Sequence, residues 1–243
     1  MRINTNVSSL TAQEAAQNTT KTLTGSLEKL STGLRINKAS DDASGLAIAD
    51  KLRTQATSIN QGIANGNSAV TLLQIADKSM AEQSNILDTV KAKLIQANTA
   101  TTSTDGRKAI ASDIAKLMTQ FDNIAKSTNY NGTDLISASA ADLDFQVGED
   151  STKGKITLTA IDSSASAYSL GALSSITSLT MASAATLQGT VDSAINSLNT
   201  NRGSIGSTQN QVESAVRNLM TMSTNVKAAE SIIRDVDYAA ESA

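Results

Sequence analysis

One apolar repeat runs unbroken from Leu187 to Asp237. Positions alternately four and three residues apart are mostly apolar over this whole range. Such spacing places the repeated positions on one face of an α-helix and is typical of a coiled coil. The 243-residue sequence contains no proline that could interrupt a helix of this kind. The chain is therefore predicted to consist of long helices that pack along their length.

Of the polar positions in this repeat, Arg202, Gln209 and Glu230 stand out. A buried polar residue in a helix contact lowers stability but can fix how the helices align. These side chains could therefore align neighbouring helices or face another subunit. The simpler interpretation is that they lie in water at the edge of the contact.

Two further stretches repeat with the same spacing. Residues 110–124 form the shorter one, and Ser103 or Thr104 is expected to cap its N-terminus. The longer one predicts a helix of roughly 50 residues, in which Gly62 and Gly66 each cost about 1 kcal/mol relative to alanine unless close packing compensates. Its repeated positions are Ala49, Leu52, Ala56, Ile59, Ile63, Gly66, Val70, Leu73, Ala76, Met80, Leu87, Val90 and Leu94.

The middle of the chain departs from the helical period. Alternating residues at 144–147 and 155–159, separated by Gly148 to Gly154, predict a β-hairpin within about 143–161. Asn129-Tyr130-Asn131-Gly132 predicts a turn. Residues 163–185 are rich in Ser, Ala and Thr, and we expect an exposed loop there. The predicted fold class is mainly α, an elongated antiparallel helical bundle or coiled coil with a small β-hairpin.

A narrow apolar stripe precedes a polar connector near the N-terminal end. The stripe consists of Leu23, Leu27, Leu30 and Leu34, spaced four, three and four residues apart. After it, Asn, Ser and Asp residues favour local side-chain bonds that compete with a helix, which predicts a hinge or connector. Its characteristic positions are Gly33, Asn37, Asp41 and Asp42.

Composition excludes most catalytic chemistry. The chain has no Cys and no His, so it lacks a thiolate, a His-paired nucleophile and the usual zinc ligands. Asp41 and Asp42 form the obvious candidate acid–base pair, but adjacent carboxylates in a connector are more typical of turn and cap groups. Gly203 and Gly206 follow no strand and form no phosphate loop. We expect no catalytic residues, no cofactor and no metal site.

Charge and hydropathy also exclude two classes of partner. The net charge is −3, and the 20 basic residues are spread along the chain, so no nucleic-acid footprint is indicated. Aromatic residues make up 2%, too few for base-stacking platforms. The sequence has no apolar run long enough to span a membrane and no apolar signal segment at its N-terminus. We expect neither nucleic acid nor a membrane as a partner.

Two long runs of sequence resemble bacterial flagellin, of the Campylobacter and Helicobacter type. The first comprises residues 1–7 (MRINTNV) and 30–49 (LSTGLRINKASDDASGLAIA), which resemble the N-terminal region of the family. The second is residues 225–243 (NVKAAESIIRDVDYAAESA), which resembles the start of its C-terminal segment. Together the runs bracket nearly the whole chain.

The resemblance implies a structural subunit of the bacterial flagellar filament, which serves swimming motility. Such a subunit is exported unfolded without a cleaved signal and self-assembles outside the cell. The expected partners are further copies of the chain in a helical homopolymer, a flagellar export chaperone and the export apparatus, and the filament cap and junction proteins. The expected location is extracellular, in the flagellum.

The resemblance also implies an organisation of the chain. Residues 1–33 would be an inner-core helix, 34–46 a connector and 47–236 a rod-like helical domain with no large outer domain. Residues 237–243 would begin a C-terminal segment whose continuation is missing. The expected subunit-packing residues are Leu23, Leu27, Leu30, Leu34, Val226 and Ile233. Without the missing segment, we expect residues 1–33 to fray unless another chain covers the stripe.

A patch on the longest predicted helix resembles the site that the vertebrate innate receptor for flagellin reads. It comprises Leu87, Asp88, Thr89, Val90 and Lys91. Thr89 stands where the family has a key arginine, so the patch lacks the fork of donors and the stacking plane of a guanidinium. We expect weak or no receptor activation. In the absence of a host, Thr89 is simply an exposed helical residue.

Three alternatives stay open at this stage. A hook–filament junction protein resembles flagellin at both ends, although the match across residues 41–49 favours the filament subunit. A chemoreceptor-like signalling rod would share the Pro-free repeats but would need neither the hairpin nor the two terminal runs. The Ser/Thr-rich segment from Ser163 to Ser183 could accept O-linked sugars, and a plain solvated loop is the simpler interpretation.

Overall fold

The computed structural model describes residues 6–150 and 152–242, which divide into two compact units. One unit comprises Met1–Asn60 with Met220–Ala243, and the other comprises Gln61–Leu219. The first five residues of the N-terminal run and the last residue of the C-terminal run lie outside the described residues. The long helices are α1 (Val7–Thr32), α2 (Ala43–Ala97), α3 (Thr104–Ser127) and α5 (Met181–Arg234), and the short ones are α4 (Gly171–Ser174) and α6 (Tyr238–Glu241).

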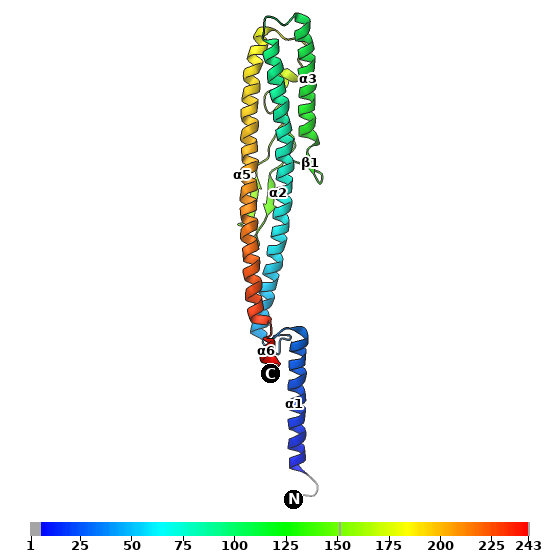
Figure 1. Cartoon of the computed structure of the whole chain (residues 1–243), viewed down its shortest axis with the longest axis vertical. Coiled ribbons are helices and arrows are strands. Elements are labelled where there is room, and N and C mark those ends of the chain that lie inside the picture. Colours follow the sequence, from blue (N-terminus) through cyan, green and yellow to red (C-terminus); the bar gives the residue numbers. More distant parts are fainter. Residues whose placement is uncertain (1–5, 151, 243) are drawn as a thin grey trace. The chain divides into compact units, whose positions relative to one another are not determined.

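Helices α2 and α5 run antiparallel within Gln61–Leu219, where they lie side by side (Figure 1). Arg202 Nε on α5 donates to Asp77 Oδ1 on α2 at 2.9 Å, and further along α2 Lys91 forms an ion pair with Asp192. Higher numbers on α2 thus meet lower numbers on α5. For Arg202, the structure supports alignment of helices within one chain. Gln209 instead bonds Glu213 on its own helix.

Helix α3 packs antiparallel against the same stretch of α2. Lys93 Nζ on α2 lies 3.0 Å from Asp113 Oδ2 on α3. The Ser103 hydroxyl accepts a hydrogen bond from the Gly106 N–H at 3.1 Å, which confirms it as the N-cap. The buried face of α3 consists of Ile110, Ala111, Ile114, Met118, Phe121 and Ala125.

Two small antiparallel sheets complete the secondary structure. Strands β3 (Leu143–Gln146) and β4 (Lys155–Leu158) pair as the predicted hairpin, with Phe145 opposite Ile156. Strands β1 (Asn129–Tyr130) and β2 (Thr133–Asp134) flank Asn131 and Gly132, whose φ angles are 50° and 80°. Positive φ at both central residues is the geometry of a tight hairpin turn. The mainly helical fold with a small β-hairpin is therefore confirmed.

The core of Gln61–Leu219 follows the predicted repeat with one local shift. Gly62 and Ala69 of α2 are buried, whereas the predicted positions Ile63 and Val70 are half-buried. The shift has a physical reason, since Gly62 and Gly66 lie so close to other backbone and side chains that a Cβ there would overlap Val147 or Val216. The largest fully buried side chains are Phe121, Leu73, Met80, Leu87, Leu94, Ile114, Met118, Ile136, Leu170, Leu173, Leu198 and Ile205.

The prediction of an exposed loop at 163–185 is wrong. Ser163 donates its N–H to Ile136 O at 2.9 Å, and Ala165 donates to Asp122 Oδ1 at 2.8 Å, so the segment is tied to the bundle. Its irregular turns bury apolar residues at no fixed period, so the sequence pattern does not reveal that these residues are buried. The buried apolar members are Ala165, Tyr168, Leu170, Leu173, Leu179 and Ala184. Helix α5 begins within this segment at Met181, and Thr180 and Ser183 cap it reciprocally.

A buried polar network links this segment to three helices. Gln83 of α2 is fully buried, and its Nε2 donates to Phe121 O at 3.1 Å and to Ser163 O at 3.0 Å. The Ser163 hydroxyl donates to Gln83 Oε1. Tyr168 Oη donates to Ser163 Oγ at 3.3 Å and accepts from Asn201 Nδ2 of α5 at 2.9 Å. Because the network's buried groups all have partners, it can fix the relative positions of α2, α3 and α5.

Candidate functional site

The surface most in need of a partner is helix α1. Asn6 caps its N-terminus by accepting from the Ser9 N–H at 3.3 Å. Gly33 ends the helix with φ 73°, and its N–H donates to Lys29 O at 2.8 Å, a left-handed cap that glycine adopts without steric cost. Between these ends no residue of α1 is buried.

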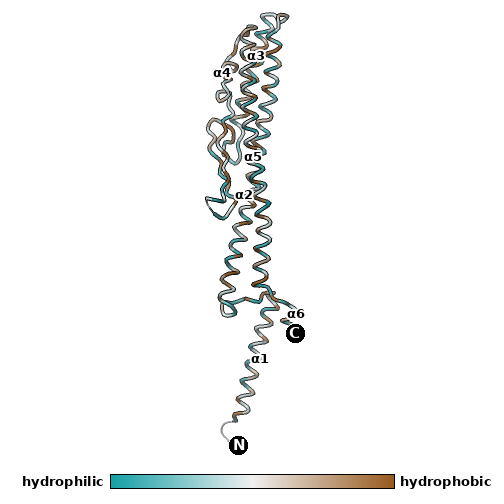
Figure 2. Tube along the Cα trace, turned by 90° about the vertical axis from the view of Figure 1, so that its left-hand side faces the viewer, coloured by the Kyte–Doolittle hydropathy of each residue, from teal (hydrophilic) through white to brown (hydrophobic). Residues whose placement is uncertain are grey.

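The N-terminal half of the leucine stripe on α1 is open to solvent, and Leu34 lies just beyond the helix. Leu23 is 59% exposed and Leu27 57% exposed, whereas Leu30 and Leu34 are half-buried. Figure 2 shows apolar positions recurring along α1. An amphipathic helix of this length gains most of its stability from packing its apolar face, so this face requires a cover.

The C-terminal end of the stripe is held by the segment that follows α5. Leu34 forms a β-bridge with Asp235, in which Arg35 N donates to Arg234 O at 2.7 Å and Val236 N donates to Gly33 O at 3.0 Å. Two predicted packing residues on the C-terminal side, Val226 and Ile233, are half-buried. Arg35 Nη2 also donates to Ile233 O at 2.7 Å, which ties the residue after Leu34 to the end of α5.

Helix α6 adds two contacts to α1 that the sequence did not indicate. Tyr238 Oη donates to Leu30 O at 2.6 Å, and Lys29 Nζ lies 3.5 Å from Glu241 Oε1. Asp237 caps α6 by accepting from the Ala239 and Ala240 N–H groups. The sequence hints at the contact of α6 with α1 only in that Tyr238 is one of three tyrosines in the chain.

The connector is shaped by its two aspartates. Asp41 Oδ2 accepts from the Asn37 N–H at 3.0 Å and the Lys38 N–H at 2.9 Å, and these bonds lower the pKa of its carboxyl group below the usual value. Asp42 Oδ1 accepts from the Gly45 N–H at 2.9 Å in the first turn of α2. Asn37 Nδ2 donates to the Thr32 hydroxyl at 2.7 Å. Both carboxylates thus act as turn and cap groups.

The receptor-like patch lies on α2. Leu87 and Val90 are buried in the bundle, so only the remaining members present side chains outward. Thr89 is exposed, and its hydroxyl donates to Asn85 O of the same helix at 2.9 Å. Asp88 is exposed, and Lys91 is engaged with Asp192.

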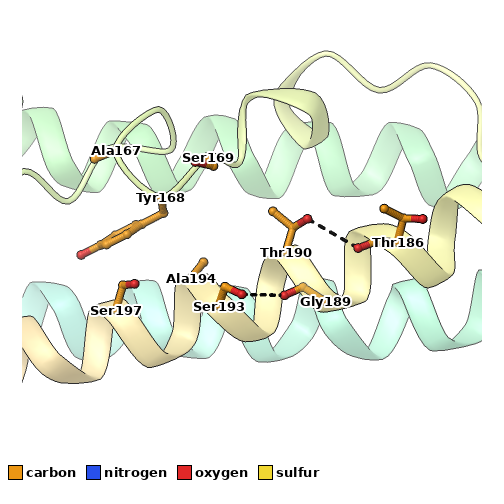
Figure 3. Close-up of a pocket in the computed structure, with 9 residues that line it drawn as sticks. All are labelled: Ala167, Tyr168, Ser169, Thr186, Gly189, Thr190, Ser193, Ala194 and Ser197. Atoms are coloured by element: carbon orange, nitrogen blue, oxygen red, sulfur yellow. Dashed lines mark hydrogen bonds between the residues drawn. The ribbon is translucent and has the colours of Figure 1, made fainter.

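A pocket of about 460 Å³ lies between residues 167–169 and α5 (Figure 3). Its lining residues are Ala167, Tyr168, Ser169, Thr186, Gly189, Thr190, Ser193, Ala194 and Ser197. The Thr190 and Ser193 hydroxyls donate back to carbonyls of α5. Burial raises the pKa of the Tyr168 phenol, which stays a neutral hydroxyl. Two of the lining hydroxyls are therefore already bonded within α5, and the phenol is uncharged.

Two general findings concern the described part of the chain. No three His, Cys, Asp or Glu side chains within it come together in a way that could hold a metal ion. None of its helices combines the length and apolarity needed to cross a membrane.

Comparison with known families assigns both ends of the chain. Residues 3–141 match the bacterial flagellin N-terminal helical region, and residues 188–243 match the bacterial flagellin C-terminal helical region. The match at the N-terminal side covers more than half of the chain.

Individual relatives agree with this assignment. Flagellin B of Helicobacter pylori is 48% identical over 147 residues, which is 60% of this chain and 29% of that protein. The flagellar filament 30.7 kDa core protein of Treponema maltophilum is 33% identical over 257 residues, 99% of this chain and 88% of that protein. The crystal structure of Bacillus cereus flagellin superposes with a TM-score of 0.57 at 26% identity, covering 69% of this chain and 94% of that one. The chain therefore belongs to the bacterial flagellin family.

Proposed function

We propose that this chain is a structural subunit of the flagellar filament, located outside the cell and acting in motility by assembly rather than by catalysis. Family membership supports the proposal, as does a relative described as a filament core protein that aligns with 99% of this chain. The chain spans 29% of the length of the Helicobacter flagellins that it matches.

The observation that carries the proposal is the uncovered face of α1. A 26-residue helix with no buried residue and two leucines more than half exposed is marginal when alone in water. We propose that other copies of this chain cover it, with Leu23, Leu27, Leu30 and Leu34 packing together with Val226 and Ile233. Before assembly, an export chaperone and the export apparatus would handle the chain, and cap and junction proteins would bind the filament ends.

Replacing Leu27 with lysine tests this assignment. Leucine and lysine have nearly equal helix propensity, so the change removes apolar surface without weakening α1 itself. Burying an unpaired ammonium in a subunit contact is costly, so we expect the variant to form no filaments under conditions in which the unchanged chain polymerises. Negative-stain electron microscopy after seeding with short filament fragments provides the measurement.

The matched control is Asn18→Lys, which places the same charge on the opposite side of α1. It should polymerise like the unchanged chain. Equal polymerisation by both variants would show that the leucine stripe is not a subunit contact. Failure of the unchanged chain to elongate any seed, with binding confined to seed ends, would favour the hook–filament junction protein instead.

For the receptor-like patch we propose weak or no activation of the vertebrate innate receptor. The exposed threonine hydroxyl already bonds within α2, and threonine offers neither the donor fork nor the stacking plane of arginine. Thr89→Arg should therefore raise the potency in a reporter-cell assay by about tenfold or more, as expected for gaining an interface arginine. Asn67→Arg, an exposed change elsewhere on α2, serves as control. Full potency of the unchanged chain would refute this proposal.

A further inference from the structure

We propose that the Asn131-Gly132 turn is a site of spontaneous deamidation in the folded chain. The sequence contains two Asn-Gly pairs, at 65–66 and 131–132. In such a pair, the nitrogen of the glycine can attack the asparagine side chain, because glycine lacks a Cβ that would hinder its approach and has wide backbone freedom. The two pairs lie in opposite structural settings, and this contrast carries the inference.

The pair at 131–132 is open. Asn131 and Gly132 are both exposed and connect the two-residue strands β1 and β2. Within the described residues, the Asn131 carboxamide has no hydrogen-bond partner and the Gly132 N–H has no backbone acceptor. Nothing lies within 4 Å of the position that a Cβ on Gly132 would take. Both reacting groups are therefore free to approach each other as the turn fluctuates.

The pair at 65–66 is fixed by hydrogen bonds and by its place inside α2. Asn65 Nδ2 donates to Gln146 O at 3.0 Å, and Asn65 Oδ1 accepts from Gln61 Nε2 at 2.9 Å. Both residues lie inside α2, where Gly66 is buried and its backbone packs against Val216. The reaction there requires α2 to open and the two side-chain hydrogen bonds to break.

The reaction conserves atoms and involves no oxidation or reduction. The Gly132 nitrogen gives up its proton to a base in solution and bonds to Cγ of Asn131. This bond closes a five-membered ring. The bond from Cγ to Nδ2 then breaks, and ammonia leaves with a proton from water, which gives a cyclic imide. Water opens the ring at either carbonyl carbon, giving aspartate or isoaspartate.

The two products affect the hairpin differently. Aspartate, like asparagine, tolerates the positive φ of this position, so that product keeps the turn and adds one negative charge. Isoaspartate inserts an extra methylene group into the main chain between Tyr130 and Thr133. That insertion breaks the pairing of these two residues across the turn.

The test compares the two sites in one molecule. Purified chain is held in mildly alkaline buffer, sampled over time and digested with trypsin, which places Asn65 in the peptide 54–78 and Asn131 in 127–153. Liquid chromatography with fragment-ion mass spectrometry separates Asn131 from Asn129 and aspartate from isoaspartate. We expect Asn131 to react at least about tenfold faster than Asn65 in the folded chain, because the helix protects the latter.

Denaturant provides the decisive control. In concentrated urea both pairs lose their structure, so the ratio of the two rates should fall close to one. The variant Asn131→Gln should remove the fast reaction and leave Asn65 unchanged. Equal rates in the folded chain would overturn the proposal, and so would a rate ratio that urea does not alter, since neighbouring residues rather than structure would then set it.

Discussion

Replacing Gly62 with alanine is expected to lower the free energy of unfolding of the Gln61–Leu219 unit by about 2 kcal/mol. A Cβ at this position would overlap the carbonyl oxygen of Val147, which is backbone and cannot rotate away as a side chain could. The hairpin or α2 must therefore shift, and such overpacking costs about 3 kcal/mol. The better helix propensity of alanine returns only about 1 kcal/mol.

Urea unfolding, followed by circular dichroism in the helical band, measures this effect. The matched control is Gly203→Ala on α5, where no atom lies within 4 Å of the new Cβ and the residue is exposed. That variant should gain about 0.5–1 kcal/mol. If both variants are stabilised to a similar degree, the close approach between α2 and Val147 does not exist in solution.

Replacing Gln83 with leucine should cost about 2–3 kcal/mol of unfolding free energy. The amide of Gln83 serves two buried carbonyl oxygens, of Phe121 and Ser163, and also accepts from the Ser163 hydroxyl. Leucine has a similar volume, so no large cavity forms. The loss comes instead from buried polar groups left without partners.

Gln74→Leu is the matched control, because Gln74 lies on the exposed side of the same helix. Its effect should stay within about 0.5 kcal/mol. A further change, Ser163→Ala added to Gln83→Leu, should cost less than the two single changes combined, since both act on one network. Strict additivity would contradict the shared network.

The helices were predictable because packing along a helix repeats in the sequence. The 4-3 register of α5 placed Val191, Leu198, Ile205 and Val212 on the buried side, and all four are buried. The N-cap could be narrowed to Ser103 or Thr104 because a cap depends on local residues only, and the structure shows Ser103. Patterns of this kind lie within a few neighbouring residues, where sequence carries the most information.

Other features depend on contacts that are distant in sequence. Gln83 falls between the repeat positions Met80 and Leu87 of α2, and its partner Ser163 is 80 residues away in a segment without periodicity. Gly62 is buried instead of Ile63 because β3 continues into Val147 at that point, which no local pattern reveals. Among the site residues, the leucine stripe is apparent from its spacing. The contact of Tyr238 with Leu30 is not, because these two residues are 208 positions apart in the sequence.

The bridge between Leu34 and Asp235 has a consequence for the order of folding. Its contacts close a loop of almost the whole chain, with Arg35 and Ile233 separated by 198 positions. The entropy lost on closing a flexible loop grows with the logarithm of its length, so this contact is unfavourable while the intervening chain is disordered. Once α2 and α5 have packed against each other, Leu34 and Asp235 are already neighbours, so forming the bridge costs little further entropy. The anchor of α1 is therefore expected to form last, after the long helices have ordered.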